Sequence, residues 1–201
     1  EGISRITPAD IRYASELGYR IKHLGITRRS EQGIELRVHP TLVEKESLLA
    51  QVNGVMNAVL VGSNAAGPTL YYGAGAGAGP TASSVVADII DVARGASMSP
   101  SFGADGTRAL PVLPIEDTRC CFYLKLLVVD KPGVLARIST ILSEHNISIE
   151  SLIQKDAKQG HAPIVIITDE TLESKLNRAL AQLQSLPEVE SEIVRIRVAS
   201  F

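Results

Sequence analysis

The clearest alternation of apolar and polar residues lies in the last 80 or so residues of the chain. Four segments there have the length and apolar content of strands: Phe122–Val129, Ile147–Asp156, Ala162–Thr168 and Val194–Val198. Apolar residues at helical spacing predict one helix from Val134 to about His145 and a second from Leu172 to Leu183. The order βαββαβ predicts a ferredoxin-like domain, whose small core often needs a partner.

The first 95 residues predict a mixed arrangement of helices and strands. Thr7 and Pro8 are typical of a helix start, Asp10 complements the positive helix end, and Gly18 is expected to end this helix. Strands are expected at Arg20–Thr27, Ile34–His39, Asn57–Val61 and Pro68–Tyr72, with a short helix around Glu46–Gln51. Beyond Pro80, an apolar stripe predicts a helix that ends at Arg94. The whole chain is therefore expected to be of the α+β or α/β class.

The segment from Gly95 to Thr118 differs in composition from both sides. It is rich in Gly, Pro, Ser and Ala, and Pro100, Pro111 and Pro114 exclude a continuous helix. We therefore predict three parts, 1–95, a linker at 96–119, and 120–201. The alternative is a long ordered loop that packs on its neighbours.

Charge and composition exclude several classes of function. The net charge of −2 gives no basic field for a nucleic acid backbone, and aromatic residues, at 4%, are too sparse for base stacking. No apolar run approaches the length that spans a bilayer. Cys120 and Cys121 are adjacent and form no disulfide framework, which fits a reducing cytoplasm. The chain opens without methionine or a signal core, so we expect it to be cut from a longer protein.

The titratable residues suggest neither a metal site nor a catalytic centre. The four histidines are scattered without the spacing of metal ligands. Cys120 and Cys121 could form a redox pair, but a vicinal disulfide strains the backbone, so two small hydrophobic residues entering a strand are the favoured interpretation. No residue of this chain is therefore predicted to be catalytic or to bind a metal.

A run of alternating glycine and alanine, Gly73 to Gly79, separates a predicted strand from a predicted helix. Such a loop lets backbone approach a ligand, and the helix start offers free N–H groups to an anion. The dinucleotide fingerprint does not fit, because its third glycine falls on Ala78 or Pro80. A flexible linker or a tight structural turn remains open on this pattern alone.

The glycine run and the helix after it resemble the C-terminal signature of homoserine dehydrogenase. The resemblance is carried by Gly73–Arg94, by Glu1-Gly-Ile3, Asp10, Ala14 and Glu16–Lys22, and by Val52–Val59, which is similar to the dimerisation region of that family. It covers residues 1–95. One departure is His23, where the family is usually apolar, which concerns local packing.

The resemblance implies that the nucleotide-binding half of the enzyme, with its catalytic lysine and acidic substrate ligands, precedes Glu1. Lys22 and Asp10 are then a strand lysine and a helix-capping acid. The resemblance also implies that the helix after the glycine run folds onto the nucleotide domain. Gly77 is expected to contact the NAD or NADP cofactor through its backbone, with Gly75 and Ala76 beside it.

The turn from Asp130 to Leu135 is the second candidate site. Pro132 fixes the turn, Gly133 allows close approach, and the free amides of a helix start favour a carboxylate while Asp130 could receive an ammonium group. An α-amino acid carries both groups; a plain strand-to-helix turn is the alternative. With His145–Ile149 in the same βαββαβ frame, the segment resembles an ACT domain. By that resemblance, the effector residues are expected to be Asp130, Lys131, Gly133, Val134, Leu135, Asn146, Ile147 and Ser148, the last three from a neighbouring copy.

These resemblances imply the C-terminal part of a cytoplasmic homoserine dehydrogenase, which interconverts L-homoserine and L-aspartate 4-semialdehyde with NAD or NADP. The ACT domain is expected to bind an amino acid and to regulate the enzyme allosterically, and threonine is the expected effector. We expect a homo-oligomer, a dimer or tetramer, because small sheets pair edge to edge. This chain by itself is expected not to turn over. The alternative is a non-catalytic module for amino-acid sensing and oligomerisation.

Overall fold

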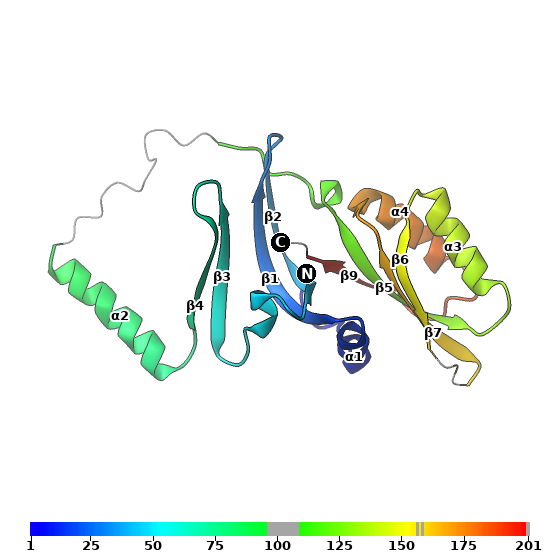
Figure 1. The fold of residues 1–201 in the computed structure, drawn as a ribbon, viewed down its shortest axis with the longest axis horizontal. Coiled ribbons are helices and arrows are strands. Elements are labelled where there is room, and N and C mark those ends of the chain that lie inside the picture. The colour runs from blue at the N-terminus through cyan, green and yellow to red at the C-terminus, as the bar shows by residue number, and fades with distance from the viewer. Residues whose placement is uncertain (96–108, 156, 158, 200–201) are drawn as a thin grey trace. The chain divides into compact units, whose positions relative to one another are not determined.

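A computed structural model describes residues 1–95, 109–155, 157 and 159–199 of the chain (Figure 1). These residues form two compact units. Unit 1 combines residues 1–45 with residues 111–201, and unit 2 comprises residues 46–110. The unit boundaries fall at other positions than the predicted division into 1–95, 96–119 and 120–201, which stays a prediction about sequence segments.

The C-terminal part of unit 1 has the expected βαββαβ order. Its elements are β5 (Arg119–Val129), α3 (Val134–Glu144), β6 (Ile149–Gln154), β7 (His161–Thr168), α4 (Glu173–Gln184) and β9 (Val194–Val198). The four strands pair antiparallel in the order β9-β5-β7-β6, which confirms the ferredoxin-like prediction. The two-residue strand β8 (Thr171–Leu172), which pairs with β5, was not predicted.

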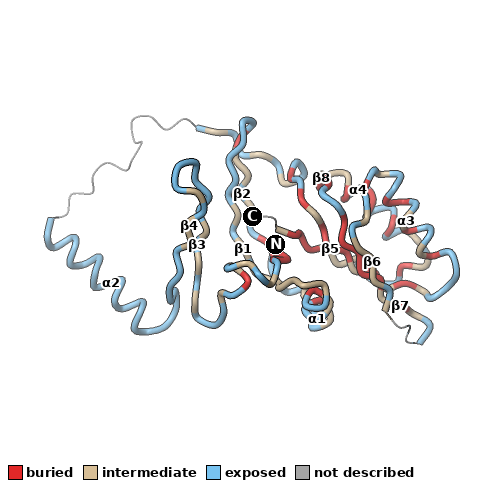
Figure 2. Tube along the Cα trace, in the orientation of Figure 1, coloured by how far each residue is buried: buried red, intermediate tan, exposed pale blue. Residues whose placement is uncertain are grey.

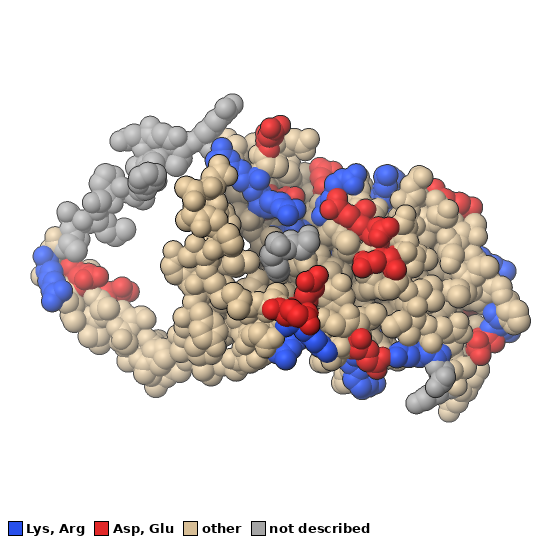
Figure 3. All heavy atoms as spheres, viewed as in Figure 1, with Lys and Arg blue, Asp and Glu red and all other residues tan. Residues whose placement is uncertain are grey.

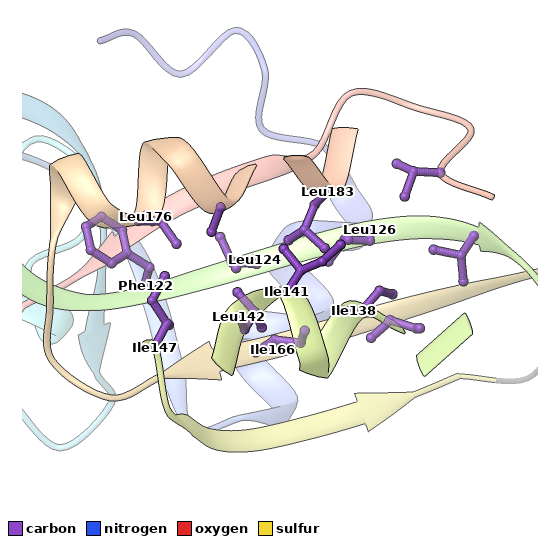
Figure 4. Close-up of a cluster of buried hydrophobic side chains, with 14 of the residues drawn as sticks. Phe122, Leu124, Leu126, Ile138, Ile141, Leu142, Ile147, Ile166, Leu176 and Leu183 are labelled. Atoms are coloured by element: carbon purple, nitrogen blue, oxygen red, sulfur yellow. The ribbon is translucent and has the colours of Figure 1, made fainter. Parts of the chain in front are cut away.

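The main core of unit 1 lies between this sheet and the helices α3 and α4 (Figure 4). Successive side chains of a strand point to opposite faces, so Phe122, Leu124 and Leu126 of β5 all point into this core. They meet Ile138 and Leu142 of α3, which are fully buried. The apolar stripe of each helix therefore has the sheet as its partner, as the periodicity predicted.

The N-terminal hairpin extends the same sheet beyond β9. Strands β1 (Tyr19–Arg29) and β2 (Ile34–Glu44) pair antiparallel, and β2 pairs parallel with β9 at Thr41↔Arg197 and Leu42↔Val198. Both strands run further than the predicted Arg20–Thr27 and Ile34–His39. The joint sheet therefore has the order β1-β2-β9-β5-β7-β6.

Helix α1 (Pro8–Glu16) covers the second face of this sheet. Thr7 and Asp10 cap it reciprocally, and Gly18 follows it with φ +87°, as predicted. Ala14 is buried against side chains of four different strands: Leu42, Tyr123, Val165, Ile167, Ile196 and Val198. A helix from the first 45 residues therefore completes the core of the C-terminal sheet.

The described end of the predicted linker is ordered against β2. The amide of Ile34 donates to the carbonyl of Pro111, and the amide of Leu113 donates to the carbonyl of Ile34, both at 2.9 Å. A short 3₁₀ helix, Ile115–Asp117, follows. Residues 111–118 are therefore hydrogen-bonded within unit 1, whereas residues 96–108 lie outside the described part of the chain, and the choice between a linker and an ordered loop stays open.

Unit 2 contains a hairpin and one long helix. A 3₁₀ turn at Leu48–Gln51, close to the predicted short helix, leads to β3 (Met56–Ser63), which pairs antiparallel with β4 (Gly67–Ala74). Helix α2 (Ala78–Ala93) begins two residues before the predicted Pro80. Among the described residues, no helix is both long and apolar enough to cross a membrane.

Candidate functional site

A turn between β5 and α3 in unit 1 forms the first candidate site. Gly133 adopts φ +89°, a left-handed conformation that glycine adopts without steric cost, and it is the N-cap of α3. The amide of Asp130 donates to the carbonyl of Gly160 at 2.8 Å, which fixes the turn against the β6–β7 connection. The turn is therefore held by backbone bonds, while the side chains of Asp130 and Lys131 stay exposed.

This turn borders a pocket of about 470 Å³. The lining residues come from β5, the turn, the first turn of α3, the end of β6 and the middle of β7: Val128, Val129, Asp130, Lys131, Pro132, Gly133, Val134, Leu135, Gln154 and Ile164. Asp130, Lys131, Gly133, Val134 and Leu135 were among the predicted effector residues.

The pocket combines opposite charges with an apolar wall. The helix start contributes the first-turn amides of Leu135 and Ala136, which have no intrahelical acceptor, and the glycine N-cap has no side chain to accept from them. Those amides and the ammonium of Lys131 favour a bound carboxylate, whereas the carboxylate of Asp130 favours a bound ammonium. This chemistry suits a zwitterion with a small side chain.

Asn146, Ile147 and Ser148 lie at the other end of α3 and do not line this pocket within one chain. Asn146 adopts φ +55° in the turn after the helix, and Ile147 is buried in the main core. The carbonyl of Ser148 accepts a hydrogen bond from the amide of Asp169. Their predicted role, as a contribution from a neighbouring copy, stays a prediction.

Gln154 and Ile164 line the pocket but were not predicted. They are cross-strand neighbours in the register of β6 and β7, and this register brings the end of β6 beside the β5–α3 turn. The sequence holds one signal for Gln154, a polar residue that ends an apolar strand. Its position beside the turn depends on how β6 pairs with β7, and the residue pattern does not predict this pairing.

The second candidate site is the glycine turn of unit 2. Gly77 is the N-cap of α2 with φ +110°, and no side chain caps this helix. A Cβ atom on Gly75 would lie 2.2 Å from Nδ2 of Asn57, so any larger residue would require the Asn57 side chain to move. Gly75, Ala76 and Gly77 therefore present bare backbone at a helix start, a geometry that fits contact with an anionic cofactor.

Unit 2 leaves most of its apolar surface exposed (Figure 2). In α2 the exposed large side chains are Val85, Val86, Ile89, Ile90 and Val92. The hairpin exposes Val59 and Tyr71 on one face and Tyr72 on the other. The sequence contains no charged residue from Ser47 to Ala87, and the hairpin and most of α2 are tan in Figure 3. A surface of this kind is typical of one that is covered in a larger assembly.

A buried ion pair connects α1 to β5. Nζ of Lys125 lies 2.7 Å from Oδ1 of Asp10, whose side chain is fully buried, and the hydroxyl of Tyr123 donates to the same oxygen at 3.3 Å. Burial alone would raise the pKa of Asp10, but the hydrogen bonds from Lys125 and Thr7 lower it below the ordinary value. Asp10, expected to be a capping acid, therefore also anchors its helix to the sheet.

His39 of β2 is another buried titratable group of unit 1. Nδ1 lies 2.9 Å from the carbonyl of Pro40 and 3.0 Å from Oγ1 of Thr41, so the hydrogen-bond network assigns the proton to Nδ1. Nε2 is buried, and no partner for it occurs within the described residues. Burial, with the nearby charges of Arg197 and Arg37, lowers the pKa of His39 to about 4.

The two cysteines show no redox or metal-binding arrangement. Both are free, and burial raises the pKa of Cys120 to about 12, so its thiol stays protonated and unreactive. This supports the interpretation of Cys120 as a small hydrophobic residue. Across the part of the chain that the structure describes, no three or more His, Cys, Asp or Glu side chains gather as a metal site would require.

Two family descriptions match the chain. Residues 1–90 match homoserine dehydrogenase, and residues 122–188 match the ACT domain. Homoserine dehydrogenase of Pseudomonas aeruginosa is 52% identical and covers 98% of this chain, while the chain covers 48% of that relative. Homoserine dehydrogenase of Neisseria gonorrhoeae is 49% identical over the full length of this chain, and the match spans 48% of that relative.

Solved structures agree with these matches. A homoserine dehydrogenase from Thiobacillus denitrificans matches 99% of this chain with a TM-score of 0.88 and 49% identity, over 47% of its own length. Homoserine dehydrogenase of S. aureus matches with a TM-score of 0.64 and 26% identity. The chain spans about half the length of the curated relatives it matches. It therefore corresponds to the C-terminal region of homoserine dehydrogenases, with a homoserine dehydrogenase segment at residues 1–90 and an ACT domain at residues 122–188.

Proposed function

We propose that this chain is the regulatory, C-terminal part of a cytoplasmic homoserine dehydrogenase, and that its ACT domain binds threonine at the β5–α3 turn. The observation that carries the proposal is the pocket in which Asp130, Lys131 and the uncapped start of α3 converge. The carboxylate of Asp130 binds the ammonium of the amino acid. The amides of the first turn of α3 bind its carboxylate.

The size and lining of the pocket support a small effector. An apolar wall of Val128, Val134 and Ile164 suits the methyl group of threonine, and Gln154 offers a donor and an acceptor to its hydroxyl. A pocket of about 470 Å³ is ample for one such molecule. Binding at this site would then report the level of an end product to the enzyme.

The glycine turn of unit 2 supports a second role, toward the cofactor of the whole enzyme. NAD or NADP, when bound, supplies the hydride chemistry of the reaction between L-homoserine and L-aspartate 4-semialdehyde. In this proposal the chain contributes backbone at Gly75, Ala76 and Gly77. The tight fit of Gly75 beside Asn57 and the uncapped start of α2 agree with that role. The catalytic lysine and the nucleotide-binding half lie in the preceding half of the enzyme, so this chain alone does not turn over.

A homo-oligomer, a dimer or tetramer, belongs to the same proposal. β2 covers one edge of the ferredoxin-like sheet, whereas β6 is the last strand in the order of the joint sheet. Pairing of β6 with a second copy would bring Asn146 and Ser148 of that copy toward a neighbouring pocket. The exposed apolar side chains of unit 2, which include residues on both faces of its hairpin, support a further contact between copies or with the preceding half.

Calorimetric titration of the purified chain tests the effector site. We expect heat on addition of L-threonine, and its loss in Asp130→Asn, which removes the charge that pairs with the ammonium. Asp169→Asn is the matched control, because Asp169 is also an exposed carboxylate but follows β7, away from the pocket lining. L-isoleucine and L-methionine serve as competing effectors. Equal heat for Asp130→Asn and the wild type would exclude this site.

The other candidate is a module that senses an amino acid and controls association only. It is favoured by the location of the whole pocket within unit 1, separate from the glycine turn. Light scattering with and without threonine, and activity of the full-length enzyme, distinguish the two. A change of oligomeric state with no change in homoserine oxidation would favour the sensing module.

A further inference from the structure

The end of β6 carries the candidate effector pocket on one face and a contact to α1 on the other. Gln154 lines the pocket beside α3. The amide of Lys155 donates to the carbonyl of Pro163 at 3.0 Å, so the strand pairing continues one residue beyond β6. Because successive side chains of a strand point to opposite faces, Lys155 points away from the pocket and toward α1.

Lys155 holds the C-terminal end of α1. Its ammonium forms an ion pair with Glu16, the last residue of that helix, and lies 5.5 Å from the centre of the Tyr13 ring. The ion pair is accessible to solvent, since the two side chains are 31% and 49% exposed. It is therefore a contact that a small change in strand position can make or break.

The N-terminal end of α1 is held differently. Asp10 is fully buried and pairs with Lys125 in the middle of β5, three residues before Val128 of the pocket. The Lys125 side chain is 18% exposed, so this pair is more shielded from solvent than the pair of Lys155 with Glu16. Helix α1 therefore has one firm anchor at Asp10 and one exposed anchor at Glu16, and only the second lies next to a pocket residue.

We infer that Lys155 is a positioning residue that transmits occupancy of the pocket to α1, and through it to the homoserine dehydrogenase segment. This inference rests on the proposed function of the pocket. A ligand that contacts Gln154 fixes the end of β6, and the neighbouring Lys155 then holds Glu16 and Tyr13 in one place. Helix α1 lies in residues 1–90, which match homoserine dehydrogenase, whereas β6 lies in residues 122–188, which match the ACT domain. The contact therefore joins the two segments inside one compact unit.

Hydrogen exchange followed by mass spectrometry, with L-threonine as the probe, tests this inference on the whole 201-residue chain. Peptides covering 128–136 report the pocket, and peptides covering 8–17 report α1. In the wild type we expect threonine to slow exchange in both, with an effect on α1 of about fivefold or more. In Lys155→Met the pocket is still protected, but α1 no longer responds.

Two further variants keep the test decisive. Glu16→Gln removes the same ion pair from the side of α1, so threonine should still protect the pocket but no longer slow exchange in α1. This variant keeps the test available when Lys155→Met does not fold. Lys175→Met, a charge loss on α4, should keep both responses. The inference is overturned when α1 responds equally in Lys155→Met, or when the wild type protects only the pocket. Threonine that protects neither peptide overturns the proposed function, and this inference with it.

Discussion

The two compact units differ in how completely each one buries its own apolar residues. Unit 1 encloses one core under α3 and α4 and a second under α1. In unit 2, Ala50 is the one buried apolar residue among those described, and α2 has none at all. Helices and paired strands can therefore be present without a closed core in the same unit. A stable fold, however, requires that their apolar faces are buried. Unit 1 encloses cores of its own, whereas the described residues of unit 2 leave their large apolar side chains exposed.

The largest expected effect comes from truncating the core of unit 1. Phe122→Ala leaves a cavity at a fully buried position and should lower the free energy of unfolding by about 3–5 kcal/mol. Tyr71→Ala removes an aromatic ring from the exposed hairpin of unit 2 and should cost less than about 0.5 kcal/mol in this chain. Urea unfolding followed by circular dichroism measures both. Similar costs would show that unit 2 has a closed core of its own.

Removing the buried anchor of α1 should have the next largest effect. Asp10→Asn leaves Lys125 without its partner in a mostly buried position and should cost about 3 kcal/mol. Because the pKa of Asp10 is lowered in the folded state, its contribution is complete above the ordinary value of 3.8 and is lost as the pH falls through the folded value. Asp169→Asn, at an exposed carboxylate, is the control. Unchanged acid stability in Asp10→Asn would contradict the assignment.

His39 should make unit 1 sensitive to mild acid. The unfolded state binds a proton with an ordinary pKa of 6.5, whereas the folded ring does so only at about 4. Stability therefore falls as the pH is lowered from 6.5 to 4, by at most about 3 kcal/mol. In His39→Gln the unfolding free energy should depend less steeply on pH in this window. Parallel pH profiles for the two proteins would show that His39 does not titrate there.

The two glycine turns should respond to alanine for different reasons. Gly133→Ala meets no atom within 4 Å of the new Cβ, so its cost of about 1 kcal/mol comes only from the left-handed backbone. Gly75→Ala instead collides with Asn57, and a second change, Asn57→Ala, should relieve that collision. Thermal unfolding of the single and double variants separates the two causes. No rescue by Asn57→Ala would contradict the close contact.

The smallest expected effect on stability is at Lys155. Its ion pair with Glu16 is exposed, so Lys155→Met should change the free energy of unfolding by about 0.5 kcal/mol or less. Urea unfolding of this variant, with Lys175→Met as control, checks this. A much larger loss would show that Lys155 stabilises the fold itself instead of reporting on the pocket.

Local features of the fold were predictable because they depend on residues close in sequence. The cap at Thr7, the left-handed Gly18 and the βαββαβ order all follow from spacing, and all are present. The pocket turn was found in the same way, because Pro132 and Gly133 lie beside the start of an apolar helix stripe.

Contacts between distant segments were not predictable from the pattern. The parallel pairing of β2 with β9 and the ion pair of Asp10 with Lys125 join residues more than 100 positions apart. Gln154 joins the pocket only through the register of β6 against β7. An acid at a helix start and a lysine in a strand are equally favourable when each is hydrated by water. The sequence of neither segment therefore indicates that the two side chains form an ion pair.

The pairing of β2 with β9 sets an order for biosynthesis. β2 cannot pair with β9 until Val198 has been synthesised, 156 residues after its partner Leu42. At ribosomal speeds of about 5–20 residues per second, that delay is roughly 8–30 s. During this time the nascent hairpin presents an unpaired edge, which is a site for chaperones to shield and for neighbouring chains to capture.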